Sequence, residues 1–141
     1  MRIVLKDLIE KLKNLFEKYN NEKGSKDCTR IKNVKFAYLY GSLAQGLDTP
    51  LSDIDVAVYL KGIPSLDEEL DLHLFMSRGL ATDRVDLLIL NRTRNIMLLE
   101  EIIKKGIVIY DTDPEFRLDF ELRVLHEAID FKEHRRAILG R

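Results

Sequence analysis

The sequence of 141 residues contains a single cysteine, Cys28, and no long apolar run. One cysteine excludes an internal disulfide framework and favours a reducing compartment. No apolar segment reaches the length that crosses a bilayer, and residues 1–20 alternate Leu and Ile with charged side chains, unlike a signal peptide. We therefore expect a cytoplasmic protein without a membrane anchor.

The sequence also lacks the usual signals for nucleic acid and for zinc. Lys and Arg number 23 against 24 Asp and Glu, so no net positive field favours general nucleic-acid binding. The locally basic stretch 131–141 is typical of a solvated helix end. The three histidines, His73, His126 and His134, have no zinc-site spacing to one another or to Cys28. No direct contact with nucleic acid is expected.

The apolar residues follow helical and strand-like spacing in alternating segments. The length suits one domain spanning residues 1–141. Helices are predicted over 4–19, from a Ser65–Glu68 capping box to about Ser77, over 93–105, and from Pro114 onward. Strands are predicted over 34–40, 51–60, 84–90 and 107–110. No repeat or linker divides the chain, so the pattern predicts one layered α/β (α+β) structure.

Four residues mark expected helix ends. Gly79 is predicted to end the second helix and Gly106 to cap the third. Asp113 is predicted to cap the last helix, with Pro114 at its first position.

The last helix carries two apolar rows at helical spacing. One consists of Phe116, Phe120, Val124 and Ala128, and the other of Leu118, Leu122, Leu125 and Ile129. Two such rows predict a helix that packs over a broad face, with both rows in the core.

Two aspartates stand at the head of an otherwise apolar strand. Asp53 and Asp55 are two residues apart, so their side chains are expected on one face, with Cα atoms roughly 6.5–7 Å apart. Carboxylates that close repel each other and raise each other's pKa. A divalent cation such as Mg²⁺ removes the conflict, because it prefers hard oxygen ligands.

Two neighbouring features strengthen a metal and phosphate interpretation. Asp86 lies in the apolar stretch "VDLLIL", where a charged residue needs a partner. Gly41 and Ser42 follow a strand, where glycine permits close backbone approach and N–H and hydroxyl groups receive phosphate oxygens. Together these residues predict a phosphoryl-transfer site in which carboxylates hold two Mg²⁺ ions roughly 3.5–4 Å apart.

The order Gly41-Ser42, ten residues, then Asp53-Ile54-Asp55, with the later Asp86, resembles the signature of the minimal nucleotidyltransferases of the DNA polymerase β superfamily. More closely, the chain resembles the antitoxin half of the HEPN/minimal-nucleotidyltransferase toxin–antitoxin pairs. The resemblance extends through "EIIKKGIVIYD" and the closing helical segment. It implies a polymerase β-type fold with a small mixed sheet of about four strands, flanking helices and a long C-terminal helix.

The resemblance also implies a function. ATP is the expected donor, and AMP is transferred to a tyrosine of a HEPN ribonuclease toxin, which is thereby neutralised within a hetero-oligomeric complex. Gly41 and Ser42 would hold the triphosphate, and Asp53 and Asp55 would coordinate both Mg²⁺ ions. Asp86 would bind the catalytic ion and help the tyrosine hydroxyl lose its proton. The chain lacks the Arg-x4–6-His pattern expected of the toxin half.

Two alternatives stay open beside this interpretation. In the first alternative the chain transfers the nucleotide to a small molecule, although 141 residues leave little room to enclose such an acceptor. In the other, the chain is a non-catalytic antitoxin that inhibits its partner by binding, although three retained carboxylates argue against it. The loop after Gly41-Ser42 carries Leu43 and Gln45, where many relatives carry an arginine.

Overall fold

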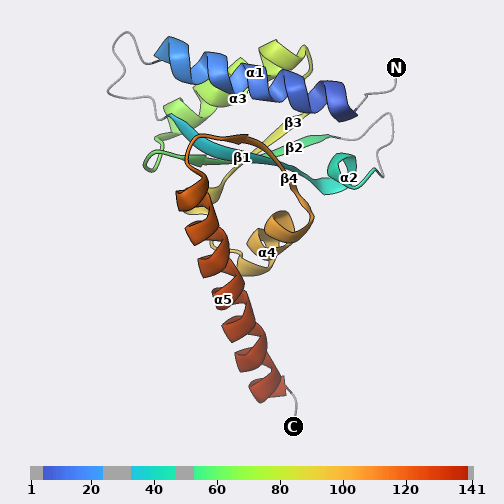
Figure 1. Ribbon diagram of the computed structural model, residues 1–141, viewed down its shortest axis with the longest axis vertical. Helices are drawn as coiled ribbons and strands as arrows, with labels where there is room; N and C mark the ends of the chain where they lie inside the picture. The colour runs from blue at the N-terminus through green and yellow to red at the C-terminus, as the bar shows by residue number, and fades with distance from the viewer. Residues whose placement is uncertain (1–4, 24–32, 47–52, 140–141) are drawn as a thin grey trace.

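In the computed structural model, which describes residues 5–23, 33–46 and 53–139, a four-stranded mixed sheet separates two layers of helices (Figure 1). The strand order is β3-β2-β1-β4, with β1 antiparallel to β2 and β4 and with β2 parallel to β3. The strands are β1 (Val34–Tyr40), β2 (Ile54–Leu60), β3 (Val85–Ile89) and β4 (Ile107–Asp111). The predicted mixed sheet of four strands is confirmed.

The helices lie on both faces of this sheet (Figure 1). They are α1 (Leu5–Lys23), α2 (Gly41–Ala44), α3 (Leu66–Leu80), α4 (Ile96–Lys105) and the long C-terminal α5 (Pro114–Leu139), with a 3-10 turn, η1, at Leu90–Arg92. None of the helices in the described residues combines the length and apolar content that crossing a bilayer requires. Cys28 lies outside the described residues.

Side chains that alternate along the strands build a separate core on each face. One core joins α1 and α3 to the sheet through residues such as Phe16, Val56 and Leu72. The other joins α4 and α5 to the opposite face and contains an aromatic cluster of Phe36, Tyr38, Tyr59, Phe116 and Phe120, with Phe36 and Tyr59 stacked at 5.0 Å. Side chains alternate between the faces from Phe36 to Tyr40 of β1, whereas a register shift between Val34 and Phe36 places these two residues in different cores although they are two positions apart.

Local capping chemistry sets several helix ends as predicted. The Ser65 side chain accepts from Glu68 N, and the Glu68 side chain accepts from Ser65 N, which completes the capping box. Asp113 Oδ1 accepts from Phe116 N at 3.1 Å, and α5 begins at Pro114. Gly106 is the C-cap of α4, as predicted.

The predicted end of α3 was wrong. Gly79 lies within α3, and the left-handed C-cap is Ala81, with φ 55°. Gly79 serves packing instead, because a Cβ there would lie 2.3 Å from Leu15 Cδ2 of α1. The missing side chain at Gly79 therefore allows α1 and α3 to approach each other closely.

Further boundaries also differ from the sequence prediction, including the end of α1, which was predicted at residue 19 and lies at Lys23. The helix predicted from residue 93 begins at Ile96, because Asn95 provides its N-cap by accepting from Leu98 N at 3.2 Å. The strand predicted from residue 51 begins at Ile54 among the described residues, which start again at Asp53.

One of the two apolar rows of α5 was also predicted wrongly. The row of Phe116, Phe120, Val124 and Ala128 is buried or half-buried against the sheet and α4, as expected. In the second row, Leu118, Leu122 and Ile129 are exposed. The sheet is too small to cover a helix of 26 residues on two sides, and α5 extends away from it (Figure 1).

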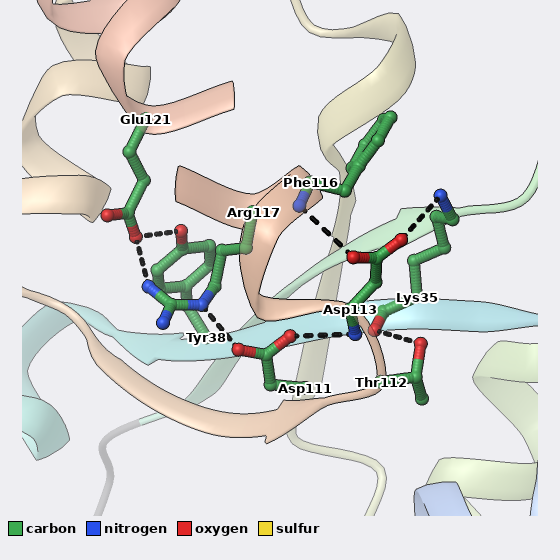
Figure 2. A network of polar contacts seen from close by, with 8 residues as sticks. All are labelled: Lys35, Tyr38, Asp111, Thr112, Asp113, Phe116, Arg117 and Glu121. Carbon is green, nitrogen blue, oxygen red and sulfur yellow. Dashed lines mark hydrogen bonds and ion pairs between the residues drawn. The ribbon is translucent and has the colours of Figure 1, made fainter. Parts of the chain in front are cut away.

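A polar network fixes the start of α5 against the sheet (Figure 2). Arg117 donates from Nε to Asp111 Oδ2 at 2.6 Å and from its guanidinium to Glu121 Oε2 at 2.9 Å. Tyr38 of β1 donates its hydroxyl to the same Glu121 oxygen at 2.6 Å. The two carboxylates hold the Arg117 pKa above its ordinary value, and burial with the Glu121 bond raises the Tyr38 pKa. The network therefore joins β1, β4 and α5.

Replacing Arg117 tests this network. We expect Arg117→Met to lower the free energy of unfolding by about 3 kcal/mol, because Asp111 and Glu121 would lose their shared cation at a site where the Arg117 side chain is 18% exposed. Lys105→Met, which removes only an exposed pair with Glu101, should cost less than about 0.5 kcal/mol. Urea unfolding measures both, and equal losses would contradict the assigned role of the network.

Candidate active site

The register of neighbouring strands aligns the side chains of Tyr40, Asp55 and Asp86 at one end of the sheet. Tyr40 of β1 stands opposite Asp55 of β2, and Asp55 stands opposite Asp86 of β3. Paired residues on neighbouring strands project to the same face. That face is the one covered by α4 and α5, since Tyr40 packs with the core on that side.

Asp55 and Asp86 lie within hydrogen-bonding contact of each other. Partial burial, the charges of Asp86 and Asp53, and this bond raise the pKa of Asp55 to about 6. Asp53 and Asp86 are exposed, whereas Asp55 is half-buried between them. The sequence predicted that Asp86 needs a partner, and its neighbour in the structure is the carboxylate of Asp55. The site therefore has an excess of negative charge.

Gly41 closes the turn from β1 into α2 directly against Asp55. Its φ is +78°, and a Cβ at this position would lie 2.2 Å from Asp55 Oδ2. Both the backbone conformation and the available space therefore require glycine. Ser42 follows as the second residue of α2, half-buried, and Leu43 is buried in the core beside α1 and α3. The predicted Gly-Ser turn thus lies beside the carboxylates in space.

Tyr40 belongs to the same constellation, although the sequence patterns did not identify it. It is half-buried, and burial together with the charges of Asp55 and Asp86 raises its pKa to about 12. In the sequence it is one more apolar residue at the end of a strand. Its position directly before Gly41 is the signal that could have found it.

The carboxylate oxygens of Asp53, Asp55 and Asp86 are the kind of ligand that a divalent cation such as Mg²⁺ binds. Within residues 5–23, 33–46 and 53–139, the structure contains no group of three Asp, Glu, His or Cys side chains arranged to hold a metal ion. Neighbouring carboxylates nevertheless supply the hard oxygen donors that Mg²⁺ prefers, and no ion pair within residues 5–23, 33–46 and 53–139 involves Asp55 or Asp86. His126 and His134 are exposed, and His73 contacts the Val85 carbonyl at 2.8 Å.

Residues 10–115 match the family model described as "Polymerase beta, Nucleotidyltransferase". No curated protein sequence matches the chain. The match covers the sheet, the Gly41-Ser42 turn and all three aspartates, and it ends at the start of α5.

Three solved structures have a similar fold. A crystal structure of a toxin–antitoxin with AMP-PNP has 23% identity and a TM-score of 0.70, covering 94% of this chain and 95% of that chain. An MntA–HpeT toxin–antitoxin mutant with two Asp-to-Glu substitutions has 21% identity and a TM-score of 0.68, covering 98% and 97%. A tri-AMPylated HEPN toxin of Shewanella oneidensis in complex with an MNT antitoxin has 20% identity and a TM-score of 0.60, covering 91% and 96%.

The repulsion at Asp55 leads to a prediction about stability. Because the folded pKa of about 6 lies above the unfolded value near 4, ionised Asp55 destabilises the metal-free fold at neutral pH. We expect Asp55→Asn to raise the free energy of unfolding by about 1 kcal/mol at pH 7.5, after allowance for solvent screening. The gain should shrink as the pH falls through 6 and vanish near 4.

Denaturant unfolding in the presence of a chelator, repeated across this pH range, measures the effect. Asp119→Asn, at an exposed position in the interior of α5, is the control and should change little at any pH. A loss of stability in Asp55→Asn at pH 7.5 would contradict the assigned repulsion.

Proposed function

The chain belongs to the polymerase β nucleotidyltransferase family, and we propose that it transfers AMP from ATP to a tyrosine hydroxyl of a HEPN-domain toxin. The transfer neutralises the toxin, which makes this chain the antitoxin of a hetero-oligomeric pair. The observation that carries the proposal is the convergence of Gly41, Asp55 and Asp86 at one end of the sheet.

The donor is held by the turn after β1. The N–H groups of Gly41 and Ser42 and the Ser42 hydroxyl receive triphosphate oxygens, because these two residues form the first turn of α2, where backbone N–H groups have no acceptor within the helix. This turn lies directly against Asp55, so phosphate and carboxylates are brought together. A divalent ion is needed to keep these two kinds of negative group side by side.

The carboxylates hold the metal. Asp53 and Asp55 would coordinate two Mg²⁺ ions, and Asp86 would bind the catalytic ion. When bound, the ions supply positive charge to the phosphate oxygens and to the leaving group. The excess negative charge around Asp55 supports this assignment, because each carboxylate otherwise destabilises its neighbours.

The reaction needs no covalent enzyme intermediate. Asp86 accepts the proton of the tyrosine hydroxyl, whose oxygen forms a bond to the α-phosphorus of ATP. The bond from that phosphorus to the bridging oxygen breaks on the opposite side, and pyrophosphate leaves. Asp86 suits this role because it is exposed on an edge strand, where an acceptor protein can reach it. Positioning and charge neutralisation provide most of the acceleration.

The solved structures with this fold support the partner and the donor. One is a tri-AMPylated HEPN toxin in complex with an MNT antitoxin, one is the MntA–HpeT toxin–antitoxin mutant, and the third is a toxin–antitoxin with AMP-PNP. ATP and Mg²⁺ are abundant in the cytoplasm, and the proposal places the pair there.

The first experiment is an intact-mass spectrum of the paired HEPN toxin after incubation with this chain and Mg-ATP. We expect one or more AMP increments, lost when Asp53→Asn or Asp86→Asn replaces the wild type and retained with Asp67→Asn, another exposed aspartate. Chelating the metal should stop the transfer as completely. An unchanged toxin mass despite tight binding would instead establish inhibition by occlusion.

A second experiment compares two glycines with positive φ. Gly41→Ala should lower the transfer rate at least about 100-fold, because the new Cβ displaces Asp55. Gly46 has a similar φ of +72°, and no atom of the described residues lies within 4 Å of the new Cβ, so Gly46→Ala carries the same backbone strain without the clash with Asp55. Single-turnover rates measure both variants. Equal losses would show that backbone strain alone, and not contact with Asp55, accounts for the effect.

A further inference from the structure

The second apolar row of α5 lies uncovered on the face of the helix opposite the core. Leu118, Leu122 and Ile129 are 51%, 56% and 54% exposed, and Leu125 between them is half-buried. We call these four residues the α5 seam. Monomeric proteins rarely leave a contiguous apolar stripe of this kind in water. The seam cannot turn inward, because Arg117 and Glu121 fix the start of α5 against the sheet.

We propose that a second copy of this chain covers the α5 seam, with the two helices antiparallel about a two-fold axis. The seam residues are spaced by four, three and four positions, which is the spacing of a coiled-coil contact line. In the antiparallel arrangement Leu118 of each copy meets Ile129 of the other, and Leu122 meets Leu125. All four layers of the contact are then apolar, and the same patch is used on both copies.

Charge at the two ends of the seam selects the second copy and its direction. Continuing the same spacing, Glu115 lies three positions before the seam and Lys132 three positions after it. Antiparallel pairing places Glu115 of one copy against Lys132 of the other at both ends. Parallel pairing would instead oppose Glu115 to Glu115 and Lys132 to Lys132.

Lys132 remains available for this contact although it already binds α4. Its ammonium contacts the Glu100 carboxylate at 2.8 Å and 3.0 Å, and its side chain is 45% exposed. Glu100 also has Lys104 at 3.2 Å, so it keeps a cation when Lys132 is shared.

The pairing leaves the active site open. α5 follows the end of β4 at Asp111, which stands opposite Phe36 near the start of β1, whereas Tyr40 and Gly41 lie at the other end of β1. The seam also lies beyond residues 10–115, the part matched by the family model. Self-association is therefore separable from nucleotide transfer.

Sedimentation equilibrium of the full chain tests the proposal. We expect a reversible monomer–dimer equilibrium in the wild type, weakened at least about 100-fold in Leu122→Glu, since the two-fold axis places the new charge in the contact twice. Leu70→Glu is the matched control, because Leu70 lies on helix α3 and is 54% exposed, much like Leu122. It should dimerise as the wild type does.

Cysteine cross-linking tests the direction of the helices. In a Cys28→Ser background, a mixture of Leu118→Cys and Ile129→Cys chains should form a disulfide-linked dimer, whereas either variant alone should not. Self-cross-linking of Leu118→Cys alone would indicate parallel helices and overturn the proposal.

A purely monomeric wild type at high concentration would also overturn the proposal. If Leu122→Glu then weakened binding of the HEPN toxin, the toxin would be the occupant of the seam. Transfer by Leu122→Glu should persist, so a failure of self-association is distinguishable from a failure of the proposed function.

Discussion

Two like charges held side by side constrain this structure more than any other interaction. Asp55 and Asp86 meet because β2 and β3 are parallel and in register. A parallel pair needs a connection that returns the chain to the starting end of the sheet, and α3 is that connection. The Ser65–Glu68 capping box and the close contact at Gly79 therefore serve the carboxylates indirectly, by fixing α3 in its return path.

The two ends of the sheet have different tasks. At the Tyr40 end, the charges of Asp53, Asp55 and Asp86 act on one another and on Tyr40. At the other end, Arg117 neutralises two carboxylates, and the aromatic cluster around Phe36 joins the sheet to α5. The Arg117 network and the aromatic cluster thus stabilise the end of the sheet where α5 begins, and the candidate active site lies at the other end.

Local chemistry made part of this arrangement predictable. Capping residues and the Gly41-Ser42 turn act on their immediate neighbours, so they can be recognised from the sequence alone. The contact of Asp55 with Asp86 depends on register between strands 31 positions apart in the sequence, which spacing can suggest but not establish. Tyr40 was missed because the antiparallel register between β1 and β2, which sequence patterns do not establish, places it opposite Asp55. The α5 seam was misassigned to the core because periodicity reveals an apolar face but not whether anything covers it.

The place of β3 at the edge of the sheet has a consequence for folding. Asp86 meets Asp55 only when β3 docks, so the repulsion arises at this pairing step and not during formation of the β1–β2 hairpin. An edge strand with one neighbour is also among the first elements to open locally. The other edge strand, β4, is held to α5 by the ion pair of Asp111 with Arg117, so we expect the β3 edge with the candidate site to open more readily. A ligand that bridges β2 and β3 would then convert binding energy into closure of that edge.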